Sequence, residues 1–264
     1  TYVSCTSLMT IVAAMMIMLY TGTMDDLLDL SALLRFAVEI GVVMLLIYAN
    51  DISINNFNGL WGVGVIPDTL AIPLTIFASV GIINAINMID GVNGLSSGYC
   101  IMASIAFGSL FYASDNVSML ILAAVSVGSL IPFLFHNVFG KTSKMFIGDG
   151  GTLVMGVVMS TFVINILTNG SSVSSSVDSN FGLVPFTLAV MAIPVFDTLR
   201  VMLTRIVRGT SPFHPDKTHL HHLFIDLGFS HAGTTVTIIT LNILVIVAQW
   251  LAWHMGCSVD VQLY

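Results

Sequence analysis

Long apolar segments separated by short polar ones dominate this chain. A helix that crosses a lipid bilayer needs about 20 consecutive, predominantly apolar residues. Eight segments come close to that length, and the second, which contains Glu39, fits least well. The predicted spans are about 3–21, 34–49, 69–88, 95–113, 117–136, 151–168, 183–204 and 234–254.

The composition favours a membrane protein over a soluble one. Of the 264 residues, 56% are hydrophobic and only 8% are charged, whereas a soluble domain carries about 25% charged residues. Because lipid cannot satisfy exposed backbone groups, spans between such short connections must be helices. We therefore predict an all-α, polytopic transmembrane helical bundle that forms a single integral membrane domain over residues 1–264, with functional loops on the cytoplasmic side.

Other features narrow the class further. The net charge of −7 argues against a nucleic-acid partner. Cys5, Cys100 and Cys257 form neither a disulfide framework nor a zinc-binding spacing. The serine-rich stretch 168–180 is expected to be a flexible loop in solvent. The chain starts with Thr1 and has no basic segment before the first apolar run, so we expect an N-terminal part to be missing.

The basic residues are segregated on one side of the predicted spans. With eight spans the connections alternate between two sides, and the connections on one side contain no Lys or Arg. All seven basic residues fall on the other side or at helix ends that reach it: Arg35, Lys141, Lys144, Arg200, Arg205, Arg208 and Lys217. Because Lys and Arg accumulate in cytoplasmic loops, the basic side is predicted to be cytoplasmic.

Four polar motifs reach that same side. They are TMDDLLDLS (23–31), NAINMIDGVNGL (84–95), FIGDGG (146–151) and HPDKTHLHH (214–222). Since they come from four separate parts of the chain, their convergence on one face predicts a single composite site.

Two of the motifs supply carboxylates. Asp25, Asp26 and Asp29 follow the first span three to four residues apart, so a continuing helix places them on neighbouring faces. Asp149 lies among glycines before the sixth span, where backbone N–H groups favour phosphate. A carboxylate there calls for a bridging cation, and Mg²⁺ takes one or two carboxylates plus substrate phosphates. The alternatives are purely structural: an acidic helix start, and an acid stabilised by a helix dipole.

The amide motif repeats every three residues. On a helix end, Asn84, Asn87, Asp90 and Asn93 form a polar stripe, which at a membrane edge must face protein, water or ligand. The alternative is a helix C-cap formed by the glycines of the motif.

The last motif is rich in imidazoles. His214, His219, His221 and His222 lie close to Asp216 and Lys217, and on a helix His219 and His222 share a face. These histidines are candidates for hydrogen bonds to phosphate or sugar oxygens, and the neighbouring carboxylates suit Mg²⁺ better than zinc. The alternative is a solvated interfacial loop.

In this order, MDDLLD, NAINMIDGVNGL, FIGDGG and SPFHPDKTHLHH resemble the motifs of the polyprenyl-phosphate N-acetylhexosamine-1-phosphate transferases, of glycosyltransferase family 4 type. The resemblance runs from about Thr21 to about Gly228, and the histidine motif resembles the undecaprenyl-phosphate N-acetylglucosaminyl-1-phosphate transferase branch. It implies a Mg²⁺-dependent enzyme of the bacterial cytoplasmic membrane, with its active site on the cytoplasmic side. Such an enzyme transfers N-acetylglucosamine 1-phosphate, or a related phospho-N-acetylhexosamine, from a UDP-sugar to undecaprenyl phosphate and releases UMP. The reaction is the first lipid-linked step of cell-surface polysaccharide synthesis.

The resemblance also implies roles for single residues. Asp25, Asp26 and Asp149 match the catalytic acids, with Asp26 and Asp149 as the expected metal ligands. The expected substrate-binding residues match the nucleotide, basic and histidine motifs: Asn87, Asp90, Asn93, Arg205, His219, His221 and His222. Mg²⁺ is the expected cofactor, with Mn²⁺ as an alternative. A UDP-sugar, a polyprenyl phosphate lipid and the membrane are the expected partners, and a homodimer is left open.

The chain departs from the family pattern in two ways. Asn93 replaces the second acid of the common DGxDGL motif, and the family has about ten or eleven spans with an early basic PxxGG element that this sequence lacks. Two other functions fit parts of the sequence. DDLLD is also the DDxxD pattern of prenyl diphosphate chemistry, which would suit an intramembrane prenyltransferase, and intramembrane acids can line the path of a transporter. The clustering of acids at one face favours phospho-sugar transfer over both.

Overall fold

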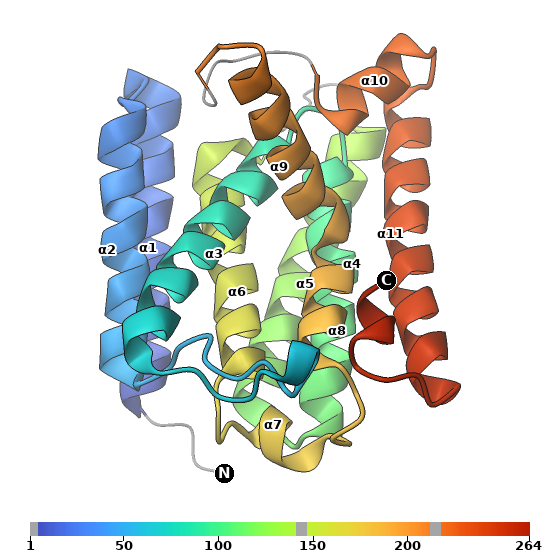
Figure 1. The fold of residues 1–264 in the computed structure, drawn as a ribbon. Coiled ribbons are helices and arrows are strands. Elements are labelled where there is room, and N and C mark those ends of the chain that lie inside the picture. Colours follow the sequence, from blue (N-terminus) through green and yellow to red (C-terminus); the bar gives the residue numbers. More distant parts are fainter. Residues whose placement is uncertain (1–4, 141–146, 212–217) are drawn as a thin grey trace.

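The computed structural model describes residues 5–140, 147–211 and 218–264 and has the architecture of an all-helical bundle (Figure 1). Within those ranges, seven helices are long and apolar enough to cross a membrane. They are α1 (Cys5–Leu28), α2 (Ala32–Asn50), α3 (Asp68–Met88), α4 (Leu95–Ala113), α5 (Val117–Phe139), α6 (Gly148–Leu167) and α11 (His231–His254). The prediction of an all-α polytopic membrane bundle is confirmed.

The predicted span 183–204 is not one straight helix. It consists of α8 (Leu183–Val190) and α9 (Ala192–Val207), which meet at an angle of 75°. Counting this bent pair as one crossing brings the number of spans in the described part of the chain to eight. Pro194 contributes to this bend. It has no N–H to donate to Val190 O, the carbonyl four residues earlier, and its ring crowds that carbonyl.

The second span is longer than the sequence suggests. α2 starts at Ala32, where the Ser31 hydroxyl accepts the Leu34 N–H, and it continues for 19 residues. Glu39 is fully buried in it because it faces α3 rather than lipid, and the Asn84 amide of α3 donates to it at 2.5 Å.

Short elements close the lower end of the bundle in Figure 1. They include the 3₁₀ turns η1 (Leu60–Gly62) and η2 (Val261–Leu263) and an isolated bridge between Asn56 and Val65. The serine-rich stretch, predicted to be a flexible loop, contains the helix α7 (Ser172–Ser176). The Ser171 hydroxyl caps it by accepting the Ser174 N–H, and Val173 is completely buried.

The helix α6 forms the centre of the bundle. Its sequence is apolar on every face, which is typical of a helix surrounded by others, and 83% of it is buried, compared with 22% of α5 and of α11. It packs on α1 and α3, and Gly22 permits the first contact because a Cβ there would lie 2.4 Å from the Asp149 carbonyl. Small residues at such interfaces let membrane helices approach closely.

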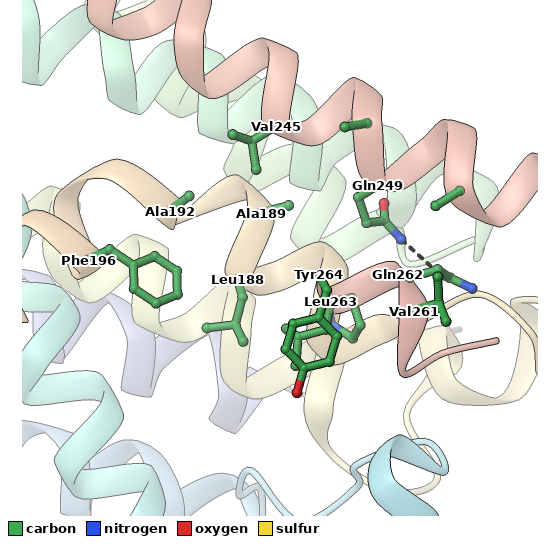
Figure 2. Close-up of a pocket in the computed structure, with 13 residues that line it drawn as sticks. Leu188, Ala189, Ala192, Phe196, Val245, Gln249, Val261, Gln262, Leu263 and Tyr264 are labelled. Atoms are coloured by element: carbon green, nitrogen blue, oxygen red, sulfur yellow. Dashed lines mark hydrogen bonds between the residues drawn. The ribbon is translucent and has the colours of Figure 1, made fainter. Parts of the chain in front are cut away.

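A crevice with about 570 Å³ of empty space separates α8 and α9 from α11 (Figure 2). Leu188 and Ala192 line one side, and Val245 and Gln249 line the other. It lies away from the upper end of the bundle, where α1, α3 and α9 end and where α6 and α10 (Leu220–Asp226) begin (Figure 1). The directions of these helices bring the predicted site residues to that upper end.

Candidate active site

The acidic pair lies in the last turn of α1, and its two carboxylates face different neighbours. Asp25 is buried and accepts from Arg35 Nη1 at 2.7 Å and from the Leu30 N–H at 2.8 Å. Both oxygens of Asp25 are therefore engaged. Asp29, the third acid of the motif, lies beyond the helix in a left-handed conformation with φ of 52°, so it does not share a helical face with the pair.

Asp26 reaches the start of α6. Both of its oxygens lie 3.1 Å from the Asp149 backbone nitrogen, and one lies 3.5 Å from the Gly150 nitrogen. The first N–H groups of a helix have no partner within the helix, so a carboxylate at the start of α6 can accept hydrogen bonds from them. Its negative charge also interacts favourably with the helix dipole. The backbone amides expected to bind phosphate thus donate to Asp26 here, and the sequence-based picture of a phosphate-binding turn is corrected to that extent.

Asp149 is held from α3. Asn87 Nδ2 donates to Asp149 Oδ1 and to Thr152 Oγ1, both at 2.8 Å. Arg35 Nη1 lies 3.8 Å from the other oxygen of Asp149, and 33% of the Asp149 side chain is exposed. One guanidinium group therefore lies between the carboxylates of Asp25 and Asp149, where it offsets their mutual repulsion.

A buried carboxylate lies one turn below that guanidinium group. Glu39 Oε1 is 3.8 Å from Arg35 Nε, and neither atom has a hydrogen-bond partner among the described residues. Asn84 Nδ2, which also donates to Val80 O at 2.9 Å, donates to the other oxygen of Glu39. Both neighbours therefore present donors to Glu39, one from the Asn84 amide and one from the Arg35 guanidinium.

The polar stripe predicted for NAINMIDGVNGL is divided among separate partners. α3 ends at Met88, so Asp90 and Asn93 lie in the following turn. Ser96 Oγ donates to the Asp90 carboxylate. Burial raises the pKa of Asp90 to about 6. The negative charges of Asp149 and Asp26 act in the same direction, and the bond from Ser96 acts against it.

Asn93 is tied to α11 through its backbone. Its N–H donates to His231 Nδ1 at 3.4 Å, and its carbonyl accepts from Thr235 Oγ1 at 2.9 Å. These contacts fix the turn that carries Asp90 against the first turns of α11. Asn93 takes part in them through main-chain atoms only, and its side chain is partly exposed.

The histidine motif is organised by a residue that the sequence analysis did not select. Asp197 of α9 lies 2.9 Å from His219 Nδ1 and accepts the Leu220 N–H at 3.1 Å, the first of α10. Arg200 Nη2 donates to it at 2.7 Å. Since an ionised carboxylate only accepts, His219 Nδ1 carries a proton, and in the neutral ring Nε2 is the acceptor atom.

The other histidines stack beside His219. The rings of His219 and His221 are 5.8 Å apart and nearly parallel, and His222 lies 4.3 Å from His221. His221 packs on the turn after α3, because a Cβ on Gly91 would lie 2.4 Å from its Nε2. Burial, with the charges of His222 and His219, lowers the pKa of His221 to about 4.

The remaining predicted residues are placed as follows. Arg205, in the last turn of α9, is 3% exposed, so its guanidinium is enclosed by protein. His214, Asp216 and Lys217 lie outside the described residues, as do Lys141 and Lys144.

The acids suit one divalent cation but not zinc. Asp26 is exposed and Asp149 partly so, and they come from two helices whose ends meet. Hard oxygen donors in this number match Mg²⁺, which keeps waters and substrate oxygens as its other ligands. In the part of the chain that the structure describes, no three His, Cys, Asp or Glu side chains gather closely enough to hold a metal by themselves.

Two residues of the site had a signal in the sequence that we did not use. Arg35 was considered only as a marker of topology, and Asp197 stood inside a predicted span. An ionisable residue within a membrane span is a candidate functional residue, and this rule identifies Asp197. Ser96 and Thr152 had no comparable signal.

Comparisons with known proteins agree on one family. The family model described as glycosyl transferase family 4 matches residues 8–167. The undecaprenyl-phosphate alpha-N-acetylglucosaminyl 1-phosphate transferase of Yersinia pestis is 28% identical over 227 residues, which cover 84% of this chain and 60% of that protein. The protein of that name from Escherichia coli K12 is 28% identical over 229 residues, covering 84% and 59%.

A relative from a third organism is similar to the same extent. The probable undecaprenyl-phosphate N-acetylglucosaminyl 1-phosphate transferase of Bacillus subtilis is 29% identical over 230 residues, which cover 84% of this chain and 59% of the relative. The chain thus spans about three fifths of the length of the curated relatives it matches.

Proposed function

This chain belongs to glycosyl transferase family 4, and on that premise we propose that it transfers N-acetylglucosamine 1-phosphate, or a related phospho-N-acetylhexosamine, from a UDP-sugar to undecaprenyl phosphate. UMP is the second product. The observation that carries the proposal is the meeting of the acidic pair of α1, Asp149 of α6 and the histidine motif at one end of a membrane bundle. Such a place lets a lipid phosphate at the membrane edge meet a water-soluble nucleotide.

The reaction joins two anions. An oxygen of the lipid phosphate attacks the sugar-bearing phosphorus of the UDP-sugar, and the bond from that phosphorus to the bridging oxygen breaks, so that UMP takes the electron pair. Catalysis of such a step depends mainly on positioning and on neutralising charge. Asp26 and Asp149 would hold Mg²⁺, or Mn²⁺, and the ion when bound would supply positive charge to the diphosphate.

The protein's own groups prepare these acids. Asn87 fixes the Asp149 carboxylate by one oxygen, which leaves the other directed toward Arg35. Arg35 in turn engages Asp25 at 2.7 Å. Asp25 would accept the residual proton of the lipid phosphate only after releasing one of its two donors. The demand is small, since a phosphate monoester has its second pKa at about 6.

The histidine end would bind the donor substrate. Asp197 binds His219 through Nδ1, which leaves the Nε2 atom of that ring to contact the substrate. Arg205, in the last turn of α9, supplies a buried positive charge. Asn87, in the last turn of α3, and Asp90, in the turn that follows, would contact the nucleotide. Asn93 would contact it only with its side chain, because its backbone N–H and carbonyl are bound to α11. His221 and His222 complete this side of the site.

We place the site on the cytoplasmic face of the bacterial inner membrane. The described basic residues support this orientation, because Arg35, Arg200, Arg205 and Arg208 all belong to the end of the bundle that carries the carboxylates, and basic residues accumulate on the cytoplasmic side. The sugar product would then enter cell-surface polysaccharide synthesis as its first lipid-linked intermediate.

The deciding experiment measures UMP release. Membranes containing the product of the complete coding sequence are incubated with undecaprenyl phosphate, Mg²⁺ and a panel of UDP-sugars. We expect UMP with UDP-N-acetylglucosamine or a close analogue, and we expect Asp26→Asn and Asp149→Asn each to abolish it. Asp178→Asn, an exposed acid beyond α7 at the opposite end, is the matched control and retains activity.

The same assay separates the other candidate functions. Ion flux without UMP release would indicate a transporter, and consumption of a prenyl diphosphate without UMP would indicate a prenyltransferase. Full activity in both the Asp26 and the Asp149 variants would remove the metal proposal.

A further inference from the structure

We propose that Asn242 and Tyr99 are positioning residues for the histidine end of the site, because they fix the bend between α8 and α9. Neither residue belongs to the motifs discussed above, and both lie deep in the bundle with no exposed surface. Their role in catalysis rests on the proposed function, whereas their effect on the bend does not.

The bend leaves backbone groups without helical partners. In a continuous helix Val190 O would accept from residue 194, but Pro194 has no N–H. The 75° angle also separates Ile193 N–H from Ala189 O, the pair that would form the preceding bond of the helix. In a membrane each unsatisfied group costs several kcal/mol, so a broken span needs replacement partners.

The side chain of Asn242 supplies them with the correct polarity. Its Oδ1 accepts the Ile193 N–H at 3.0 Å, and its Nδ2 donates to Ala189 O at 3.2 Å and to Val190 O at 3.1 Å. The amide of Asn242 is thus inserted into the missing hydrogen bond between Ile193 and Ala189. The hydroxyl of Tyr99, from α4, donates to Val190 O as well. Two neighbouring helices therefore hold the break open at a defined angle.

The helix α11 connects this break to the rest of the site. Its first turns bind the backbone of Asn93 through His231 and Thr235, and Asn242 follows on the same helix. Because α11 is continuous from His231 to His254, it sets α9 in register with the turn that carries Asp90.

Small changes in the bend are large at the site. Asp197 lies four residues beyond Ile193, about 6 Å along the helix, so a change of about 10° displaces it by about 1 Å. A displacement of that size can lower a rate by about 100-fold. The end of α9 lies about 24 Å from the bend, since the helix has 16 residues, and moves by about 4 Å.

The test measures the direction of α9. Spin labels are attached to cysteines introduced at Val207 and Leu33, which are 85% and 81% exposed, after Cys5, Cys100 and Cys257 are replaced by alanine. Distances between the labels are measured by double electron–electron resonance. We compare wild type, Asn242→Leu and Tyr99→Phe, with Gln249→Leu as matched control.

The control removes the same chemistry from the same helix. Gln249 is also a buried amide of α11, but it donates to Gln262 of the C-terminal turn at 3.1 Å and not to the break (Figure 2). We expect Asn242→Leu to shift or broaden the label distance by about 4 Å, Tyr99→Phe to do so in the same direction by less, and Gln249→Leu to leave it unchanged.

UMP release supplies a second readout. We expect the KM for the UDP-sugar to rise about tenfold or more in Asn242→Leu and to stay within about twofold of wild type in Gln249→Leu. Lower thermal stability of Asn242→Leu with unchanged distance and unchanged KM would overturn the proposal, because that is the result of a purely structural role. If Asn242→Leu yields no folded protein, an unchanged distance in Tyr99→Phe overturns it. A wild-type protein that releases no UMP would refute the proposed function, while the distances would still decide the bend.

Discussion

Replacing Asp197 by asparagine tests how the histidine motif is held. The Asp197 carboxylate accepts from His219 Nδ1 at 2.9 Å and from the Leu220 N–H at 3.1 Å, and Asp197 itself is 7% exposed. Asparagine keeps the shape and one acceptor oxygen but places an N–H₂ group where the second oxygen was. The N–H₂ group then faces either His219 Nδ1 or Arg200 Nη2, because these two donors meet different oxygens of Asp197. One of those two bonds is therefore lost, and a donor is turned toward another donor, while the Leu220 N–H lies 3.1 Å from both oxygens and can keep a partner.

The magnitude follows from the type and burial of each bond. A hydrogen bond to a charged group contributes about 1.5–3 kcal/mol. The ion pair with Arg200, whose side chain is 46% exposed, adds at most about 1 kcal/mol. We expect a loss of about 2–3 kcal/mol in the placement of His219, which corresponds to a decrease of about 30- to 160-fold in kcat/KM for UMP release.

The assay compares initial rates of UMP release at equal amounts of folded membrane protein, with Asp226→Asn as control. Asp226 is an exposed acid in the same short helix α10, so its replacement should leave kcat/KM within about twofold. The reasoning is refuted by an Asp197→Asn variant whose kcat/KM stays within threefold of wild type, or by an equal loss in the control.

Three further predictions concern packing, pH and metal. Gly22→Ala should lower the free energy of unfolding by about 1–3 kcal/mol in a detergent titration, since its Cβ would overlap the backbone of Asp149; Gly41→Ala, with nothing within 4 Å, should lose none. His221 has its pKa lowered to about 4, so the unfolded chain binds the extra proton below about pH 6.5, and the stability of His221→Asn relative to wild type should rise as pH falls from 6.5 to 4. Asp90 has its pKa raised to about 6, so the folded protein binds the extra proton between pH 3.8 and 6. The stability of Asp90→Asn relative to wild type should therefore rise as pH rises through that window. Thermal melts recorded against pH test both the His221 and the Asp90 variants, and slopes of opposite sign would contradict the two pKa assignments. Chelation by EDTA should stop UMP release and added Mg²⁺ or Mn²⁺ should restore it, whereas release that is insensitive to chelator would contradict a role for a divalent ion.

The spans were predictable because bilayer thickness sets their length. Seven predicted spans correspond to helices, and α1 and α5 extend beyond the predicted ends into polar last turns. The bend between α8 and α9 was not predicted. Pro194 was visible in the sequence, but we propose that the angle depends on Asn242 and Tyr99. These residues lie far from the break along the chain, so the sequence gives no sign that they contact it.

The site was predictable as a gathering of motifs but not as a set of contacts. Four ordered motifs pointed to one end of the bundle, and the described parts of those motifs lie there. The contact of Asp26 with the first amides of α6 was not foreseen, since the motif pattern does not say which acid faces which helix end. Arg35 and Asp197 were missed for a related reason, because one was grouped with basic residues of the loops and the other with an apolar span.

The enclosure of α6 has a consequence for how the bilayer affects this protein. A change in lipid composition alters hydrocarbon thickness, and membrane helices respond by tilting at a cost of fractions of a kcal/mol per Å of mismatch. That force acts on helices in contact with lipid, such as α5 and α11, which are each only 22% buried. Because other helices surround α6, we expect hydrophobic mismatch to reach Asp149 only through its neighbours, whereas it acts directly on α11, whose Asn242 contacts the bend of α9.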